Sequence, residues 1–273
     1  MKRVITTGVF LSVMAMFFLF PGCGLQRTLL YHPERFTMEE VQRYARQFGL
    51  EPWPAGNSSY LGLISRDHAP SPRGTVVVFH GNAGSAVHRS YYADALVPRG
   101  FRVIVAEYPG YGARSGKMSE ESFTDDARLI AEVVREQFDG PLYFWGESLG
   151  AAVAAAAVSD STLVVEGLAL ITPWDTLYNL ARAKLPIFPA GFFMRDKYDS
   201  AKNLVGYSGP KSVLMAERDE IIPPRLTRRL YESMPEPKRF WLFEQAGHNT
   251  WPTDSRLQWW DEVAAYLEST GAE

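Results

Sequence analysis

From residue 59 onward, short apolar runs alternate with amphipathic stretches of helical period. This alternation predicts a mainly parallel sheet with helices on both faces, because parallel neighbours need a long crossover between them. Runs that are apolar throughout indicate strands buried on both faces. We therefore expect an α/β fold with strands at 61–64, 75–79, 102–107, 142–145, 167–172, 211–216 and 239–243.

Charge and cysteine content exclude several classes of function. The chain has 28 Lys and Arg against 31 Asp and Glu, so it lacks the basic surplus of a nucleic-acid-binding protein. A single cysteine, Cys23, excludes an internal disulfide framework and any zinc or iron–sulfur site built from cysteines. Zinc-protease, Walker and dinucleotide-binding motifs are absent from the sequence. We expect no metal, no cofactor and no nucleic-acid partner.

A nucleophile motif follows the predicted strand 142–145. Gly146-Glu147-Ser148-Leu149-Gly150 leads into a helix of small residues, which is the context required of a G-x-S-x-G elbow. Such an elbow holds its serine on a strained turn between strand and helix, and the flanking glycines remove side chains that would collide there. The pattern predicts Ser148 as the nucleophile.

A serine hydroxyl needs a base and an orienting carboxylate to become nucleophilic. His248 lies in a loop just after the last predicted strand, and Gly247 allows the turn that would aim its ring at Ser148. Asp219 follows the strand 211–216 and precedes His248 in the chain, as the order serine, acid, histidine requires. The alternatives for the acid are Glu217, Glu220 and Asp175, the last of which follows the preceding strand.

Two backbone amides are candidate donors to a developing oxyanion. The strand 75–79 ends in His80-Gly81-Asn82, a glycine-containing turn that can expose the Asn82 N–H. The Leu149 N–H lies at the start of the helix that follows Ser148, where the helix dipole favours negative charge. These positions predict an oxyanion hole made by Asn82 and Leu149.

These motifs together resemble the α/β-hydrolase superfamily over residues 59–270. The stretch EYPGYGARSG at 107–116 is similar to a strand-end loop of its small-cap members, close to the abhydrolase-domain depalmitoylases. The resemblance implies a sheet of eight strands in which only the second is antiparallel, one more strand than the seven located above. Residues 24–58 are then a lead-in segment of unassigned role.

The segment from about 173 to 210 lacks clear strands and is longer than an ordinary connection, so we expect a small cap inserted into the fold. Its apolar residues, with aromatic residues near strand ends, suggest an acyl pocket, although the same residues would also suit a core. The candidate substrate contacts are Tyr111, Trp174 and Phe192.

Residues 1–23 have the character of a signal peptide or a membrane anchor. Lys2 and Arg3 precede the apolar run 4–20, which is short for crossing a bilayer. Its end resembles the lipobox of bacterial lipoproteins, in which Cys23 would carry the lipid. We expect a lipid-anchored protein of the bacterial cell envelope with its main domain outside the cytoplasm. The alternatives are that residues 1–23 form an uncleaved membrane anchor, or that they are neither a lipoprotein signal nor an anchor.

The sequence thus predicts a membrane-associated serine hydrolase that cleaves ester or thioester bonds of a small or lipid-like substrate through an acyl-enzyme. A peptidase or amidase with the same triad is one alternative. A non-catalytic envelope protein that uses the fold for binding is the other. The sequence leaves the oligomeric state open.

Overall fold

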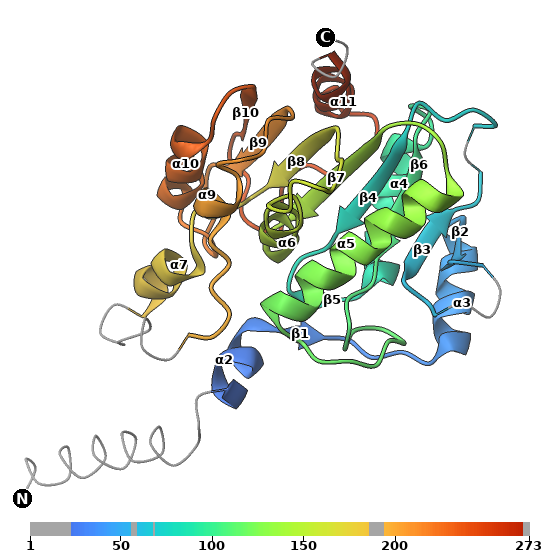
Figure 1. Cartoon of the computed structure of the whole chain (residues 1–273), viewed down its shortest axis with the longest axis horizontal. Helices are drawn as coiled ribbons and strands as arrows, with labels where there is room; N and C mark the ends of the chain where they lie inside the picture. Colours follow the sequence, from blue (N-terminus) through green and yellow to red (C-terminus); the bar gives the residue numbers. More distant parts are fainter. Residues whose placement is uncertain (1–22, 56–58, 68, 186–193, 270–273) are drawn as a thin grey trace, which may run out of the picture.

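A computed structural model of the protein describes residues 23–55, 59–67, 69–185 and 194–269 (Figure 1). Its centre is an eight-stranded sheet with the strand order β10-β9-β8-β7-β4-β6-β3-β2. Within it, β3 runs antiparallel to both of its neighbours, and the other pairs are parallel. The strands are β2 (Leu50–Trp53), β3 (Gly62–Ser65), β4 (Thr75–Phe79), β6 (Arg102–Ala106), β7 (Leu142–Glu147), β8 (Gly167–Ile171), β9 (Lys211–Ala216) and β10 (Lys238–Phe243).

The predicted α/β class is therefore confirmed, and the seven strands located from sequence lie within one or two residues of their predicted bounds. The eighth strand is β2, which lies inside the segment 24–58 whose role the sequence left unassigned. The sheet consequently starts earlier in the chain than residue 59.

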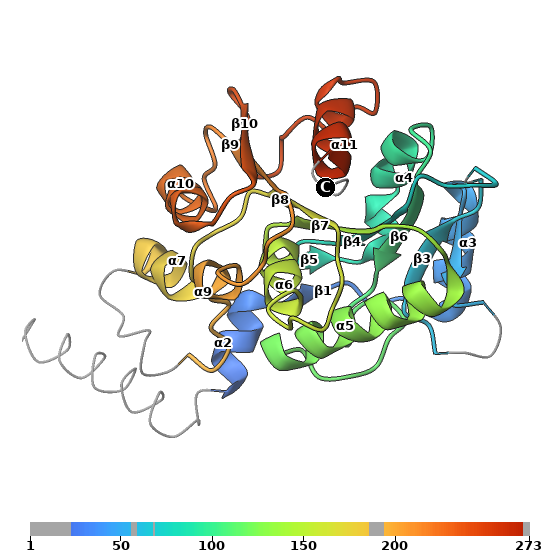
Figure 2. The ribbon, with the colours of Figure 1, turned by 45° about the horizontal axis from the view of Figure 1, so that its top comes forward.

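Helices cover both faces of the sheet (Figures 1 and 2). One apolar core lies under α5, α6 and α10, and a second lies under α3, α4 and α11. Every residue of α6 is buried, and its run of alanines allows it to lie close against the strands. The helices are α3 (Met38–Gln47), α4 (Tyr91–Leu96), α5 (Glu120–Gln137), α6 (Leu149–Ala157), α10 (Pro224–Ser233) and α11 (Trp259–Ser269), with a short 3-10 helix η1 (Ala86–Arg89) before α4.

Local sequence explains where the longer helices begin. Thr37 and Glu40 form a reciprocal capping box at α3, in which each side chain accepts from the other residue's backbone N–H. Ser119 caps α5 by accepting from the Ser122 N–H, and two glutamates in its first turn suit the helix dipole.

The first part of the lead-in segment contacts the body through α2 (Cys23–Leu30) and β1 (His32–Pro33). Helix α2 contacts the predicted cap segment, where the Gln26 side chain accepts from the Arg195 N–H and donates to the Asp196 carbonyl. Strand β1 pairs with β5 (Ala83–Gly84) in a separate two-stranded sheet. Both attachments join parts of the chain that are far apart in sequence.

The predicted cap contains two short helices, α7 (Leu177–Lys184) and α9 (Ser200–Asn203). They lie beside α10 at one end of the sheet, on the left of Figure 1. Residues 186–193 of this segment lie outside the described residues.

Candidate active site

The turn between β7 and α6 has the geometry of a nucleophile elbow. Ser148 has φ 54° and ψ −114°, a left-handed conformation that a side chain other than glycine rarely adopts. A Cβ on Gly146 would overlap the backbone of Gly150, and one on Gly150 would overlap the Phe79 carbonyl. The Ser148 N–H donates to the Ile171 carbonyl at 2.9 Å, which fixes the turn against β8. The two glycines are therefore needed for the strand and helix to approach as closely as they do.

His248 lies between Ser148 and Asp219. Its Nε2 is 3.1 Å from the Ser148 Oγ, and its Nδ1 is 2.8 Å from the Asp219 Oδ2. The other oxygen of Asp219 accepts from the N–H groups of Ile221 and Ile222, at 2.9 and 2.6 Å, so the carboxylate is held in place. This arrangement of nucleophile, base and carboxylate is the one that activates a serine for acyl transfer.

The other candidate acids have different partners. Asp175 accepts from the Asn179 side chain at 2.7 Å and lies 3.5 Å from the Arg229 guanidinium, so it joins α7 to α10. Glu217 accepts from the Gln245 N–H at 2.8 Å. The structure thus places Asp219, rather than Asp175 or Glu217, against His248.

Glu220 contacts the backbone of His248 and not its imidazole ring. Its carboxylate accepts from the His248 N–H at 3.1 Å. Hydrogen bonds from its own backbone N–H and from that of His248 hold the pKa of Glu220 below its usual value. A negative side chain thus fixes the backbone of the residue whose ring faces Ser148.

The turn His80-Gly81-Asn82, which carries the predicted oxyanion donor Asn82 and which we call the oxyanion loop, lies beside Ser148. A Cβ on Gly81 would be 3.8 Å from the Ser148 Cβ, so the turn after β4 and the elbow are in close contact. The Asn82 carbonyl accepts from the His32 N–H and the Tyr111 hydroxyl, and its side-chain amide donates to the Leu30 carbonyl. Within the described part of the chain, neither the Asn82 N–H nor the Leu149 N–H has a hydrogen-bond acceptor. Their assignment as oxyanion donors stays a prediction.

Glu147, the residue before the nucleophile, links the elbow to that loop. Its buried carboxylate accepts from the Gly81 N–H at 3.0 Å, the Arg89 Nε at 2.5 Å and the Tyr91 hydroxyl at 2.6 Å. Burial alone would raise the pKa of Glu147, but the Arg89 charge and the hydrogen bonds from Tyr91 and Gly81 outweigh it and lower the pKa. This role of Glu147 could not be predicted from the sequence, because the G-x-S-x-G motif leaves the residue before the serine unspecified.

Two of the three predicted substrate contacts, Tyr111 and Trp174, are buried. Tyr111 is fully buried, packs against Phe123 and donates to the Asn82 carbonyl at 2.7 Å, so it supports the oxyanion loop in place of the predicted substrate contact. Trp174 is also buried, directly after β8. Phe192 lies outside the described residues.

The described residues also bear on the metal and membrane predictions. In the ranges that the structure describes, no three His, Cys, Asp or Glu residues gather in a way that could hold a metal ion. None of the helices in those ranges is long and apolar enough to cross a bilayer. Cys23, the predicted lipidation site, is the first residue of α2, and residues 1–22 lie outside the described part.

Comparison with known proteins identifies sequences that are similar to part of the chain. A family model described as serine aminopeptidase, S33, matches residues 70–187. An uncharacterized protein of Mycobacterium tuberculosis is 33% identical over 177 residues, which cover 64% of this chain and 62% of that protein. The lysophosphatidylserine lipase ABHD12 of Danio rerio is 29% identical over 178 residues, covering 58% of this chain and 46% of the lipase. The chain thus matches less than two thirds of the length of each relative.

Solved structures show the same architecture at low sequence identity. An α/β hydrolase of Penicillium sp. sh18, GrgF, superposes with a TM-score of 0.61 at 14% identity, over 82% of this chain and 99% of that one. At this identity the likeness concerns the fold, because unrelated functions share one architecture.

Proposed function

We propose that this chain, which has the α/β-hydrolase fold, is a membrane-associated serine hydrolase that cleaves carboxylic ester or thioester bonds. The observation that carries this proposal is the contact of His248 with both the Ser148 hydroxyl and the Asp219 carboxylate, at 3.1 and 2.8 Å. Hydrolysis of an acyl group is the chemistry for which this arrangement is suited.

In the first half of the reaction, the Ser148 Oγ attacks the acyl carbonyl carbon while its proton passes to the His248 Nε2. The carbonyl oxygen becomes an oxyanion, which accepts from the N–H groups of Asn82 and Leu149. Asp219 stabilises the imidazolium that forms and keeps Nδ1 protonated. The intermediate then collapses, the bond to the alcohol or thiol breaks, and His248 returns the proton to the leaving group.

In the second half, water attacks the acyl-serine and gives its proton to the His248 Nε2. The second tetrahedral intermediate uses the same two amides. When it collapses, the carboxylic acid leaves and the proton returns to the Ser148 Oγ. The cycle needs no metal and no oxidant or reductant.

Two observations support an ester with an acyl chain as substrate. One of the similar proteins is a lysophosphatidylserine lipase, whose name describes action on a lipid. The chain itself begins with Lys2, Arg3 and the apolar run 4–20, which would place the enzyme at a membrane. We place the folded domain outside the cytoplasm of a bacterial cell, attached through a lipid on Cys23.

Peptide or amide hydrolysis is the second candidate, favoured by the description of the matching family model as a serine aminopeptidase. The same triad cleaves amides when the leaving amine is protonated. Substrate tests therefore need to include amides as well as esters and thioesters.

The test uses the full-length protein in detergent. A fluorophosphonate probe should label the wild type and leave Ser148→Ala unlabelled, while Ser208→Ala, which changes an exposed serine elsewhere, keeps the label. The same proteins are then assayed with p-nitrophenyl esters of increasing chain length, acyl thioesters and aminoacyl anilides. We expect the wild type to hydrolyse the esters and the thioesters. Faster turnover of the anilides would favour the peptidase. A folded wild type that neither takes the label nor turns over any of these substrates would refute the proposal.

Attachment through Cys23 has a separate test. Cells supplied with a labelled fatty acid should incorporate the label into the wild type and not into Cys23→Ser. A labelled Cys23→Ser protein would refute lipidation at this residue. A wild-type protein found only in the cytosol would refute the envelope location.

A further inference from the structure

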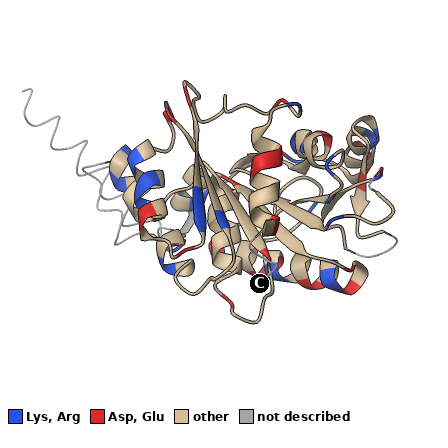
Figure 3. Ribbon diagram, turned by 90° about the horizontal axis from the view of Figure 1, so that it is seen from above, with Lys and Arg blue, Asp and Glu red and all other residues tan. Residues whose placement is uncertain are grey.

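The charges of this protein are unevenly distributed along the chain. Between residues 177 and 230 there are ten Lys and Arg and five Asp and Glu, although the whole chain carries a net charge of −3. This segment contains α7, α9 and α10, which lie together at one end of the sheet (Figure 1). Figure 3 shows basic residues gathered on the helices at that end, on its left. One end of the molecule is thus basic while the remainder is acidic.

The basic side chains at this end are exposed, and most of them have no carboxylate partner. We call this surface the basic end and define it by eight exposed residues: Arg182, Lys184, Arg195, Lys197, Lys202, Arg225, Arg228 and Arg229. Among the described residues, only Arg229 of the eight lies within salt-bridge distance of a carboxylate, that of Asp175. Arginines elsewhere are commonly paired, as Arg99 is with Asp261 and Arg135 with Glu166.

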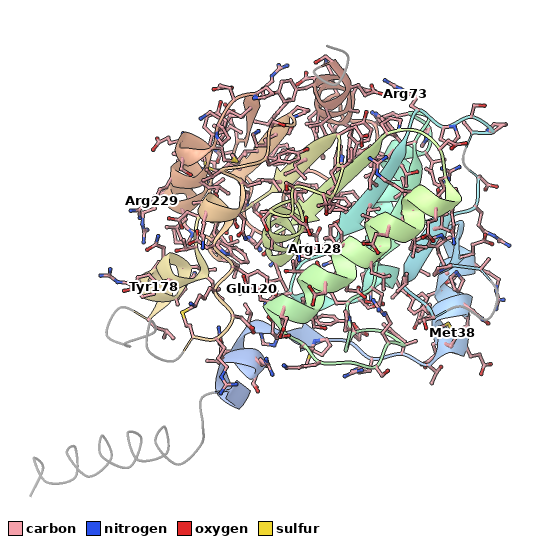
Figure 4. All side chains as sticks on the ribbon, viewed as in Figure 1. Met38, Arg73, Glu120, Arg128, Tyr178 and Arg229 are labelled. Atoms are coloured by element: carbon pink, nitrogen blue, oxygen red, sulfur yellow. The ribbon has the colours of Figure 1, made fainter. Side chains whose placement is uncertain are left out.

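Large apolar side chains are exposed among these charges. Half of the ten exposed large hydrophobic residues of the described chain lie on or beside the basic end: Leu29, Tyr178, Leu185, Val205 and Ile221. The Arg182 guanidinium lies over the Tyr178 ring, 5.8 Å from its centroid. Figure 4 shows Tyr178 and Arg229 on the same side of the molecule, opposite to Met38. Interspersed basic, aromatic and aliphatic side chains are typical of surfaces that enter the headgroup region of a bilayer.

From these observations we propose that the basic end is a docking surface for the anionic phospholipids of a bilayer. Charge complementarity argues for this occupant, since each Lys or Arg near an anionic membrane strengthens binding about five-fold. The position of α2 is a second argument, because this helix directly follows the apolar run 4–20 in sequence and contacts Arg195 and Asp196. A chain anchored at its start would therefore hold this end close to the bilayer.

The docking surface reaches the candidate active site. Ile221 is exposed two residues after Asp219, and the Lys184 Nζ donates to the Glu220 carbonyl at 2.5 Å. The Glu220 carboxylate in turn accepts from the His248 N–H. Docking by this surface would bring the triad to the level of lipid ester groups. The importance of this placement for catalysis rests on the proposed function, whereas binding to lipid does not.

The test compares vesicles of phosphatidylcholine with vesicles that also contain about 30 mol% phosphatidylglycerol. The full-length protein is used throughout, so that its N-terminal segment contributes equally to both. We expect the wild type to bind the anionic vesicles at least ten-fold more tightly at low salt, with the preference falling as salt rises. Equal binding to both vesicles at low salt would overturn the proposal.

Charge-reversal variants identify the surface responsible. The triple variant Arg182→Glu, Arg225→Glu and Arg228→Glu should lose the preference for anionic vesicles. The matched control reverses three exposed basic residues away from this end, two on α3 and one before α5: Arg43→Glu, Arg46→Glu and Lys117→Glu. It has the same net charge and should keep the preference. A control that loses as much as the triple variant, or a triple variant that loses nothing, would overturn the proposal.

Two further measurements separate this inference from the proposed function. Thermal unfolding should show a cooperative transition for both triple variants, and the salt dependence of the wild type tests the electrostatic attraction without any substitution. Hydrolysis of a soluble ester should be the same in all three proteins, because none of the changed residues contacts the triad. Loss of all hydrolysis in every protein with vesicle preference intact would refute the enzyme and leave the docking surface standing.

Discussion

Replacing Glu147 by glutamine tests whether this residue positions the oxyanion loop. The substitution keeps the shape of the side chain and removes its negative charge, which leaves Arg89 buried without its partner. Breaking a buried ion pair in this way costs about 3 to 5 kcal/mol. The Arg89 side chain is 17% exposed, and the glutamine oxygen can still accept from the Gly81 N–H, so we expect the lower part of that range.

The expected effect on turnover follows from the position of Gly81, next to the proposed donor Asn82. Complete loss of one oxyanion donor costs about 10² to 10³ in kcat, and a displaced donor should cost less. We therefore expect Glu147→Gln to lower kcat for a soluble ester about ten-fold with little change in KM, since the substrate carbonyl gains its charge only in the transition state.

The assay measures ester turnover and urea unfolding of the same preparations. Glu268→Gln is the control, because it breaks the more exposed pair with Arg73 and should cost less than about 1 kcal/mol with unchanged kcat. A Glu147→Gln protein that is destabilised but retains full kcat would show that Glu147 supports the fold without positioning the loop. A Glu147→Gln protein with unchanged kcat and unchanged free energy of unfolding would refute both the positioning role and the stabilising role of Glu147.

The pH dependence of stability gives an independent measure of the same residue. The pKa of Glu147 in the folded state lies below its ordinary value of 4.5, so the folded state binds fewer protons there than the unfolded state. Its stabilising contribution is complete above about pH 4.5 and is lost as pH falls through the folded pKa. The wild type should therefore be more stable than Glu147→Gln at neutral pH, and this difference should shrink on acidification. A difference that stays constant from about pH 5 to 3 would contradict this.

Two further predictions concern the elbow and the acid. Gly150→Ala places a Cβ against the Phe79 carbonyl and should destabilise the protein by more than about 3 kcal/mol or prevent folding, whereas Gly206→Ala, where the added Cβ meets nothing within 4 Å, should be neutral in urea unfolding. Asp219→Asn should lower kcat roughly 10³- to 10⁴-fold, while Asp175→Asn leaves kcat within a few-fold; the reverse order would assign the acid to Asp175.

The sequence predicted those features that depend on short local patterns. The elbow could be located because glycines are sterically required on both sides of Ser148, and the clash of an added Cβ at each position shows why. His248 and Asp219 could be located because each follows a strongly apolar strand, and such strands end at the same edge of a parallel sheet.

Other features depend on contacts that no local pattern records. Strand β2 has only four residues and includes Glu51 and Pro52, so its apolar signal is weak although it pairs with β3. The sequence placed Tyr111 near strand ends as a substrate contact, but its burial against Phe123 arises from packing between distant segments. The hydrogen-bond partners of Glu147 come from two other stretches of the chain, one at Gly81 and one at Arg89 and Tyr91. No sequence motif in either stretch predicts this contact.

The pairing of β1 with β5 has a consequence for the extent of the working enzyme. His32 donates to the Asn82 carbonyl through its N–H, and the Asn82 side chain donates to the Leu30 carbonyl, so the segment before the first sheet strand holds the residue proposed to meet the oxyanion. The smallest catalytic unit therefore extends well upstream of the region shared with the matching family model, which starts at residue 70. Displacement of residues 30–32 would act on the backbone and side chain of Asn82 through these two hydrogen bonds.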